Sequence, residues 1–168
     1  MTKLIVANWK MNGTKESAHG FCQKITALTQ ESSTKNTLVI CPPVPYLDSL
    51  KNNLKTSHIK LGAQDCSAAL EGAYTGEVSA QMLVDMDCNY VLIGHSERRQ
   101  HHQESTDLLS KKLHQALAAG LQPIFCIGES EVDYDANGTQ DILKKQLKAL
   151  IDFKGNKNII VAYEPVQP

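Results

Sequence analysis

Six short apolar runs recur along the chain, and they restrict it to a small number of folds. The runs are rich in Val and Ile and mostly do not alternate with polar residues, which is the pattern of strands that are buried on both faces. They are Leu4–Ala7, Leu38–Ile40, Ile59–Ala63, Tyr90–Ile93, Ile124–Ile127 and Ile159–Ala162. Strands of this kind belong to parallel sheets that are covered by helices.

Apolar residues spaced three and four apart lie between these runs and predict helices. Leu109, Leu113 and Ala116 mark the clearest such face, and Gly120 follows it as the expected C-terminal cap. Strand and helix alternate in units of about 30 residues, the length of a βαβ unit. We therefore expect six strands with five intervening helices in one α/β domain over residues 1–168, because no linker or low-complexity segment interrupts the chain.

Polar residues follow most of the runs, and they favour a barrel over an open sheet. Functional groups at the carboxyl ends of several strands are typical of α/β-barrel enzymes, whereas an open sheet concentrates its site at one switch point. No glycine-rich phosphate loop follows the first run. The polar residues are Asn8, Lys10, Gln64, Asp65, His95, Glu129 and Glu164.

The composition argues against several other classes of protein. The formal net charge is -1, so no basic surface for nucleic acid or for an anionic membrane is indicated. No apolar run approaches the length of a membrane span. The five cysteines are widely spaced without a C-x-x-C motif, which indicates reduced thiols in a cytoplasmic protein rather than a zinc knuckle.

The stretch GHSERR places chemically active side chains directly after a buried strand. His95 is expected to lie at the start of a helical turn, with Ser96 as its cap and Glu97 at the positive end of its dipole. That dipole disfavours a protonated imidazole, so a neutral His95 would donate a hydrogen bond to a developing oxyanion. The alternative is a loop histidine with backbone partners, and single-motif assignments are often false.

Two further ionisable residues follow strands. Pro165 pushes Glu164 toward an extended backbone, which would aim the carboxylate into the mouth of the sheet as a general base. Lys10 would stabilise an anionic substrate and its transition state. A surface glutamate and a solvated lysine are the alternatives, and each is the commoner fate of its residue type.

Six motifs together resemble the triose-phosphate isomerase family, in the family's order and spacing. The resemblance runs from the first residues to Val166. The motifs are VANWKMNG (6–13), GAQDCS (62–67), GAYTGEVSA (72–80), YVLIGHSERR (90–99), PIFCIGE (123–129) and VAYEPV (161–166).

The resemblance implies a role for each matching residue. Glu164 would be the base that moves a proton between two carbons, His95 the neutral electrophile, and Lys10, oriented by Asn8, the residue that binds substrate. Ser96 and Glu97 would lie behind them. The substrates would be glyceraldehyde 3-phosphate and dihydroxyacetone phosphate, interconverted in glycolysis and gluconeogenesis in the cytoplasm without a metal or an organic cofactor.

The resemblance also implies a partner, because members of the family are homodimers. The loop from Gln64 to Glu77, including Gly76, would reach into the partner subunit, with Thr75 near the partner's site. No nucleic acid and no membrane is expected as a partner.

The match to the family stops at the last two residues. After EPV the family has a tryptophan and a glycine-bearing lid loop, whereas Gln167 and Pro168 follow here. A (β/α)8 barrel typically needs about 250 residues, and this chain has 168. We therefore expect an incomplete TIM barrel that does not form a stable closed monomer by itself. We also expect negligible isomerase activity from it, because the loops that grip the substrate phosphate are missing.

Two other functions remain open at this stage. Cys126, with His95 and Glu164, would make a thiol hydrolase chemically conceivable. A non-catalytic subunit that docks on a full-length isomerase through the loop containing Thr75 is the other alternative.

Overall fold

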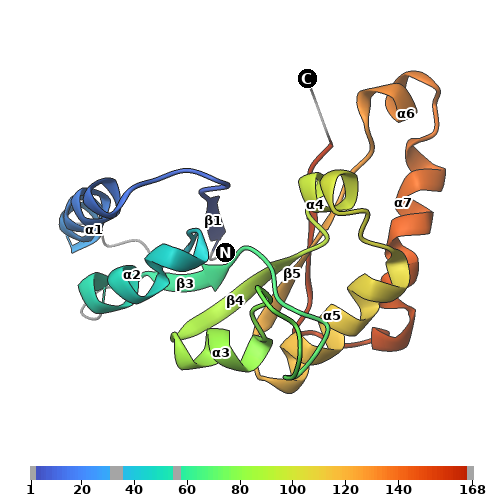
Figure 1. Cartoon of the computed structure of the whole chain (residues 1–168). Coiled ribbons are helices and arrows are strands. Elements are labelled where there is room, and N and C mark those ends of the chain that lie inside the picture. The colour runs from blue at the N-terminus through green and yellow to red at the C-terminus, as the bar shows by residue number, and fades with distance from the viewer. Residues whose placement is uncertain (1–2, 31–35, 55–57, 166–168) are drawn as a thin grey trace.

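The computed structural model describes residues 3–30, 36–54 and 58–165 of the chain. Its six strands form one parallel sheet in which they lie side by side in chain order, so that β1 and β6 are the two edges. The strands are β1 (Leu4–Asn8), β2 (Thr37–Cys41), β3 (Lys60–Ala63), β4 (Cys88–Ile93), β5 (Gln122–Ile127) and β6 (Ile160–Tyr163). The sheet curls, and the helices lie around its outside, as in part of a TIM barrel (Figure 1). The predicted strands and fold class are thereby confirmed.

Each of the five connections between strands carries helix, as predicted, but three of them carry more than one segment. The elements are α1 (Lys15–Gln30), the 3-10 turn η1 (Val44–Tyr46), α2 (Leu47–Leu54), α3 (Ala80–Asp85), α4 (Ser96–His101), α5 (Thr106–Ala118), α6 (Glu131–Asp135), α7 (Thr139–Leu147) and the 3-10 segment η2 (Lys148–Phe153). The extra segments are short, and a window of three to six residues carries too little periodicity to be recognised in a sequence.

Helix α5 shows how local sequence fixes an element. The hydroxyl oxygen of Ser105 accepts a hydrogen bond from the backbone N–H of Leu108 and so caps the first turn. At the other end Gly120 has a φ of 87°, which lets the Leu121 N–H turn back to the carbonyl oxygen of Ala116. The predicted C-terminal role of Gly120 is therefore confirmed.

The two faces of the sheet bury different side chains. On β4, Val91 and Ile93 pack outward among helix residues, while Leu92 between them belongs to a separate cluster made of strand residues. This alternation follows from the period of two in a strand. The second cluster contains Val39, Cys41, Leu92, Ile124 and Cys126, and it fills the concave side of the curled sheet.

Candidate active site

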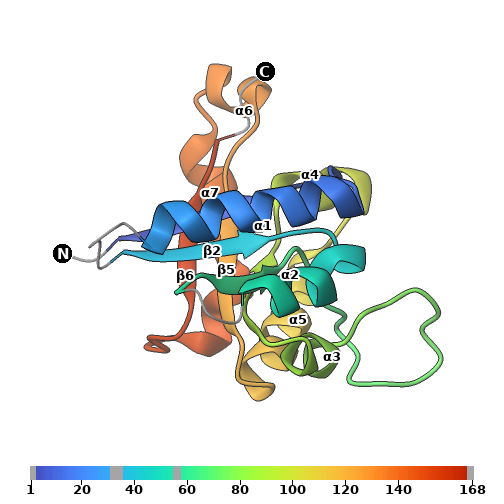
Figure 2. The same cartoon turned by 90° about the vertical axis from the view of Figure 1, so that its left-hand side faces the viewer.

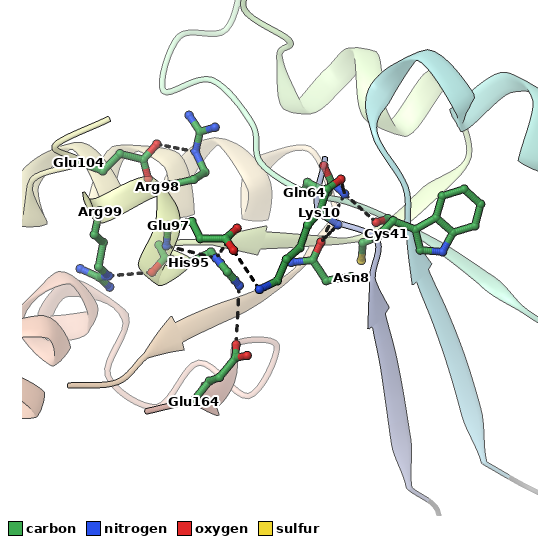
Figure 3. Close-up of polar contacts among 12 residues, drawn as sticks. Asn8, Lys10, Cys41, Gln64, His95, Glu97, Arg98, Arg99, Glu104 and Glu164 are labelled. Atoms are coloured by element: carbon green, nitrogen blue, oxygen red, sulfur yellow. Dashed lines mark hydrogen bonds and ion pairs between the residues drawn. The ribbon is translucent and has the colours of Figure 1, made fainter. Parts of the chain in front are cut away.

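The carboxyl ends of the parallel strands meet at one rim, and the predicted polar residues lie there. Asn8 is the last residue of β1, Gln64 follows β3 directly and Glu164 follows β6 directly. Lys10 and His95 each lie two residues beyond a strand, β1 and β4 respectively. Figure 3 shows that the side chains of Lys10, His95 and Glu164 point toward one another from three separate strand ends.

Lys10 is held in an uncommon backbone conformation. Its φ is 53°, in the left-handed region that few residues other than glycine occupy. Its backbone N–H donates to Asn8 Oδ1 at 2.9 Å, and its carbonyl oxygen accepts from Gln64 Nε2 at 2.8 Å. Gln64 Nε2 also donates to Asn8 Oδ1 at 3.3 Å and to the carbonyl oxygen of Cys41 at 3.0 Å. These contacts hold the turn after β1, and so they fix where the Lys10 side chain starts.

The Lys10 ammonium pairs with a carboxylate from α4. Lys10 Nζ lies 2.9 Å from Glu97 Oε1, and both side chains are about half exposed. The hydrogen bond to Glu97 raises the pKa of Lys10, and the same bond lowers the pKa of Glu97. Both groups are therefore charged throughout the neutral range, and the site presents a fixed cation.

His95 is buried, with 6% of its surface exposed, and it caps α4 through its own side chain. Its Nδ1 accepts a hydrogen bond from the backbone N–H of Glu97 at 3.3 Å. An accepting nitrogen carries no proton, so this bond favours the neutral tautomer with the proton on Nε2. His95 Nε2 lies 3.6 Å from Glu164 Oε2.

The sequence prediction that Ser96 caps this helix is wrong. Ser96 is the first residue of α4, and His95 is the cap. The reason is steric reach: imidazole Nδ1 stands at the same distance from the backbone as the side-chain oxygen of Asn or Asp, so it can accept from the second helical N–H.

The carboxylate of Glu164 comes from a loosely covered part of the rim. Its backbone N–H donates to the carbonyl oxygen of Ile127 at 2.8 Å, which continues the β5–β6 pairing by one residue. Its side chain is 64% exposed. The backbone of Glu164 is thus fixed, while its carboxylate is open to solvent.

An open cavity of about 480 Å³ lies at this rim, within the size range of small-molecule sites. Lys10 and His95 line this cavity, and the Glu164 carboxylate lies beside it, 3.6 Å from His95 Nε2. A small carbonyl compound held between these side chains could receive a hydrogen bond and lose a proton. The lining residues are Asn8, Lys10, Met11, Asn12, Gln64, His95, Glu97, Arg98, His101 and His102.

Comparison with known families agrees with this geometry. The family model described as "Triosephosphate isomerase" matches residues 3–168. The chain belongs to the triosephosphate isomerase family. The resemblance that the six sequence motifs indicated is confirmed.

Individual relatives show the extent of the similarity. The triosephosphate isomerase of Xanthomonas axonopodis pv. citri (strain 306) is 44% identical over 167 residues, and that of Hahella chejuensis (strain KCTC 2396) is 41% identical over 165 residues. In each case the match covers 98% of this chain and 66% of the relative, so the chain spans slightly less than two thirds of their length. A crystal structure of triosephosphate isomerase from Bartonella henselae superposes with a TM-score of 0.90 at 37% identity, covering 100% of this chain and 70% of that one.

The structure separates two groups among the residues predicted from the sequence. Gln64, which was assigned to a dimer loop, lies in the cavity and supports Asn8 and Lys10. Thr75, Gly76 and Glu77 are exposed on the long loop between β3 and α3. Figure 2 shows this loop projecting from the body of the molecule.

A buried ionic network behind the cavity was not predicted from the sequence. Lys112 Nζ lies 2.6 Å from both Asp65 Oδ2 and Glu104 Oε1, and Arg98 contacts the same two carboxylates at 2.9 and 2.8 Å. The network joins the end of β3 to α4 and α5. One signal was present in the sequence: Lys112 falls on the apolar face of its helix, between Leu109 and Leu113, where a lysine needs a partner.

The environment of Cys126 argues against the thiol-hydrolase alternative. Cys126 is buried, and burial raises the pKa of its thiol to about 11, so the sulfur is protonated at neutral pH. A nucleophilic cysteine needs the opposite shift. Cys126 serves as a small core residue on the concave face of the sheet.

The described residues form neither a metal-binding cluster nor a membrane-spanning helix. No cluster of three or more His, Cys, Asp or Glu side chains there is placed to hold a metal ion. In the same residues, no helix combines the length and the apolar character that crossing a bilayer requires.

Proposed function

We propose that the cavity at the strand ends isomerises a phosphorylated triose, interconverting dihydroxyacetone phosphate and glyceraldehyde 3-phosphate. The observation that carries this proposal is the approach of His95 Nε2 to Glu164 beside the ammonium of Lys10. Membership of the triosephosphate isomerase family supports it. The expected setting is the cytoplasm, as part of glycolysis and gluconeogenesis.

The three side chains divide the chemistry among them. The Glu164 carboxylate removes a proton from the carbon next to the carbonyl, while the carbonyl oxygen gains a hydrogen bond from His95 Nε2–H. The resulting enediol or enediolate takes the proton back from Glu164 on the neighbouring carbon. The hydroxyl proton on the first carbon passes at the same stage to the former carbonyl oxygen, so that the aldehyde forms and no atom is gained or lost. Lys10 stabilises the negative charge that develops on oxygen. A glutamate base with a neutral histidine is the pairing for which triosephosphate isomerase is itself the standard example.

Solvent deuterium provides a direct test of the proton transfer. Dihydroxyacetone phosphate is incubated with the chain in D2O, and uptake of deuterium at carbon is followed by NMR, which detects slow proton exchange as well as net turnover. We expect uptake to fall by at least about 100-fold in Glu164→Gln, because general-base catalysis contributes roughly 10²–10⁴-fold. The control is Glu16→Gln, at an exposed position on α1.

Equal uptake by Glu164→Gln and the unchanged chain would contradict the proposed base. The same assay measures how active this chain is by itself. The sequence-based expectation of negligible activity stays a prediction until that rate is compared with the rate of a relative such as the Xanthomonas enzyme.

We further propose that the exposed loop between β3 and α3 docks on a second copy of the chain. The loop carries Leu70 and Tyr74, both more than half exposed. A groove of about 790 Å³ is lined largely by apolar side chains, among them Val44, Met82 and Met86. Exposed apolar patches of this kind are commonly covered in an assembly. Docking of the loop containing Thr75 on a full-length isomerase remains the alternative form of this proposal.

A further inference from the structure

Gly128 directly follows β5, and its backbone lies against the backbone of Glu164. A side chain at this position would overlap the carbonyl group of Glu164, so only glycine allows the two backbones to lie this close. The neighbouring residue Ile127 accepts the backbone N–H of Glu164 at 2.8 Å. Ile127, the last residue of β5, thus binds the N–H of Glu164, and Gly128, the next residue, lies against its carbonyl group.

Gln146 on α7 is hydrogen-bonded to Gly128. Its Nε2 donates to the Gly128 carbonyl oxygen at 2.8 Å, and its Oε1 accepts from the Gly128 N–H at 2.9 Å. The two bonds bind both polar groups of one residue, as a neighbouring strand would. Their direction also assigns the amide, because Oε1 must face the N–H and Nε2 must face the carbonyl.

Gln146 is absent from the residues that line the catalytic cavity. It lines instead a second cavity of about 570 Å³ behind the rim, together with Gly128 and Arg99. Arg99 acts on the same part of the rim, since its guanidinium donates to the carbonyl oxygens of Gly94 and Cys126. The hydrogen bonds of the Gln146 side chain run to Gly128, so Gly128 directly links α7 to the backbone of Glu164.

We propose that Gln146 is a positioning residue, which sets the distance between the Glu164 carboxylate and His95 by holding Gly128 in place. This inference rests on the proposed function, because Glu164 needs an accurate position only if it transfers a proton. A displacement of about 1 Å in a reacting group can cost on the order of 100-fold in rate. The Glu164 side chain is largely exposed, so its backbone anchor is the main restraint on its position.

The test compares Gln146→Leu with Gln140→Leu. The first substitution removes both hydrogen bonds at similar volume, and the second makes the same change at an exposed position of the same helix. In the deuterium assay we expect kcat to fall at least about tenfold in Gln146→Leu, with KM changed by less than about threefold. An equal small effect in both variants would overturn the proposal, as would a loss confined to thermal stability.

A second readout does not depend on turnover. When Gln146 and Gln140 are both intact, the substitution Glu164→Gln should shift the 15N resonance of His95 Nε2, because the two side chains lie 3.6 Å apart. In the Gln146→Leu background we expect this shift to fall by at least about half, and in the Gln140→Leu background to be unchanged. A full shift in both backgrounds would overturn the proposal.

The two measurements distinguish a failure of the proposed function from a failure of the inference about Gln146. If the unchanged chain takes up no deuterium, the proposed function fails, and the NMR comparison alone decides whether Gln146 positions Glu164. If Gln146→Leu does not give a folded spectrum, Gln146→Asn replaces it. That variant keeps the amide but shortens its reach by one methylene group, and the same loss of the His95 shift is expected.

Discussion

At the scale of single residues, the site depends on backbone geometry that cannot be predicted from the sequence. Lys10 has a positive φ, and two hydrogen bonds hold this turn: its N–H donates to Asn8 Oδ1, and its carbonyl oxygen accepts from Gln64 Nε2. The types of residue at the strand ends could be predicted from the sequence, and the resemblance supplied their roles. The contacts of Gln64 could not be predicted, since a strand-end glutamine has many possible partners until the strands are in place.

The Lys10–Glu97 pair gives a residue-scale prediction. Glu97 raises the pKa of Lys10 above 10.5, and Lys10 lowers the pKa of Glu97 below 4.5, so the pair is fully charged between those two values. Replacing Glu97 with Gln removes the carboxylate that is the largest cause of the raised Lys10 pKa. We therefore expect the pKa of Lys10 to return toward 10.5. NMR titration of the lysine 13Cε resonance measures this, with Glu16→Gln as the control. An unchanged Lys10 titration in Glu97→Gln would show that the pair does not form in solution.

At the scale of elements, the strands and the longer helices follow from the sequence, because their periodicity extends over enough residues to be recognised. The split of the β4–β5 connection into α4 and α5 does not. It depends on the cap formed by His95, which is not one of the usual capping residue types, and on the ionic network that fixes α4 to α5. In that network Asp65 is 47 residues away from Lys112 in the sequence, so the contact could not be recognised before the chain is folded. Lys112 was the one local sign of this network.

Glu104 tests how much the network stabilises these elements. Burial by itself raises the pKa of Glu104, but the hydrogen bonds from Lys112 and Arg98 outweigh it, and the net pKa lies below the ordinary value of 4.5. A carboxylate with a lowered folded pKa stabilises the fold above its ordinary pKa, and this contribution is lost as pH falls through the folded pKa. We expect Glu104→Gln to lower the free energy of unfolding by about 3 kcal/mol at pH 7.

The difference in the free energy of unfolding between the unchanged chain and Glu104→Gln should become smaller as pH falls below 4.5. Urea unfolding at pH 7 and at about pH 4 measures both quantities. The control is Glu71→Gln, an exposed residue of the loop between β3 and α3. If this difference in the free energy of unfolding became larger at low pH, Glu104 would not be held ionised by its neighbours.

At the scale of the whole molecule, the proposed assembly of two copies can be tested at the apolar groove. Met82 lines the groove and is 57% exposed. Burying a methionine side chain is worth about 1.5–3 kcal/mol, so Met82→Asp should weaken association at least about tenfold. Sedimentation equilibrium measures the dissociation constant, with Val132→Asp on α6 as the control, since Val132 is also an exposed apolar residue. Equal weakening by both variants would mean that this groove is not the interface.

The strand order of the sheet also has a consequence for synthesis of the protein. Lys10 follows the first strand and Glu164 follows the sixth, and these strands lie at opposite edges of the sheet. While the ribosome is still adding residues, a nascent chain therefore holds an ammonium and later an imidazole, but no base opposite them. Under the proposed function, a nascent chain shorter than 164 residues therefore lacks the base that would remove a proton from a bound triose.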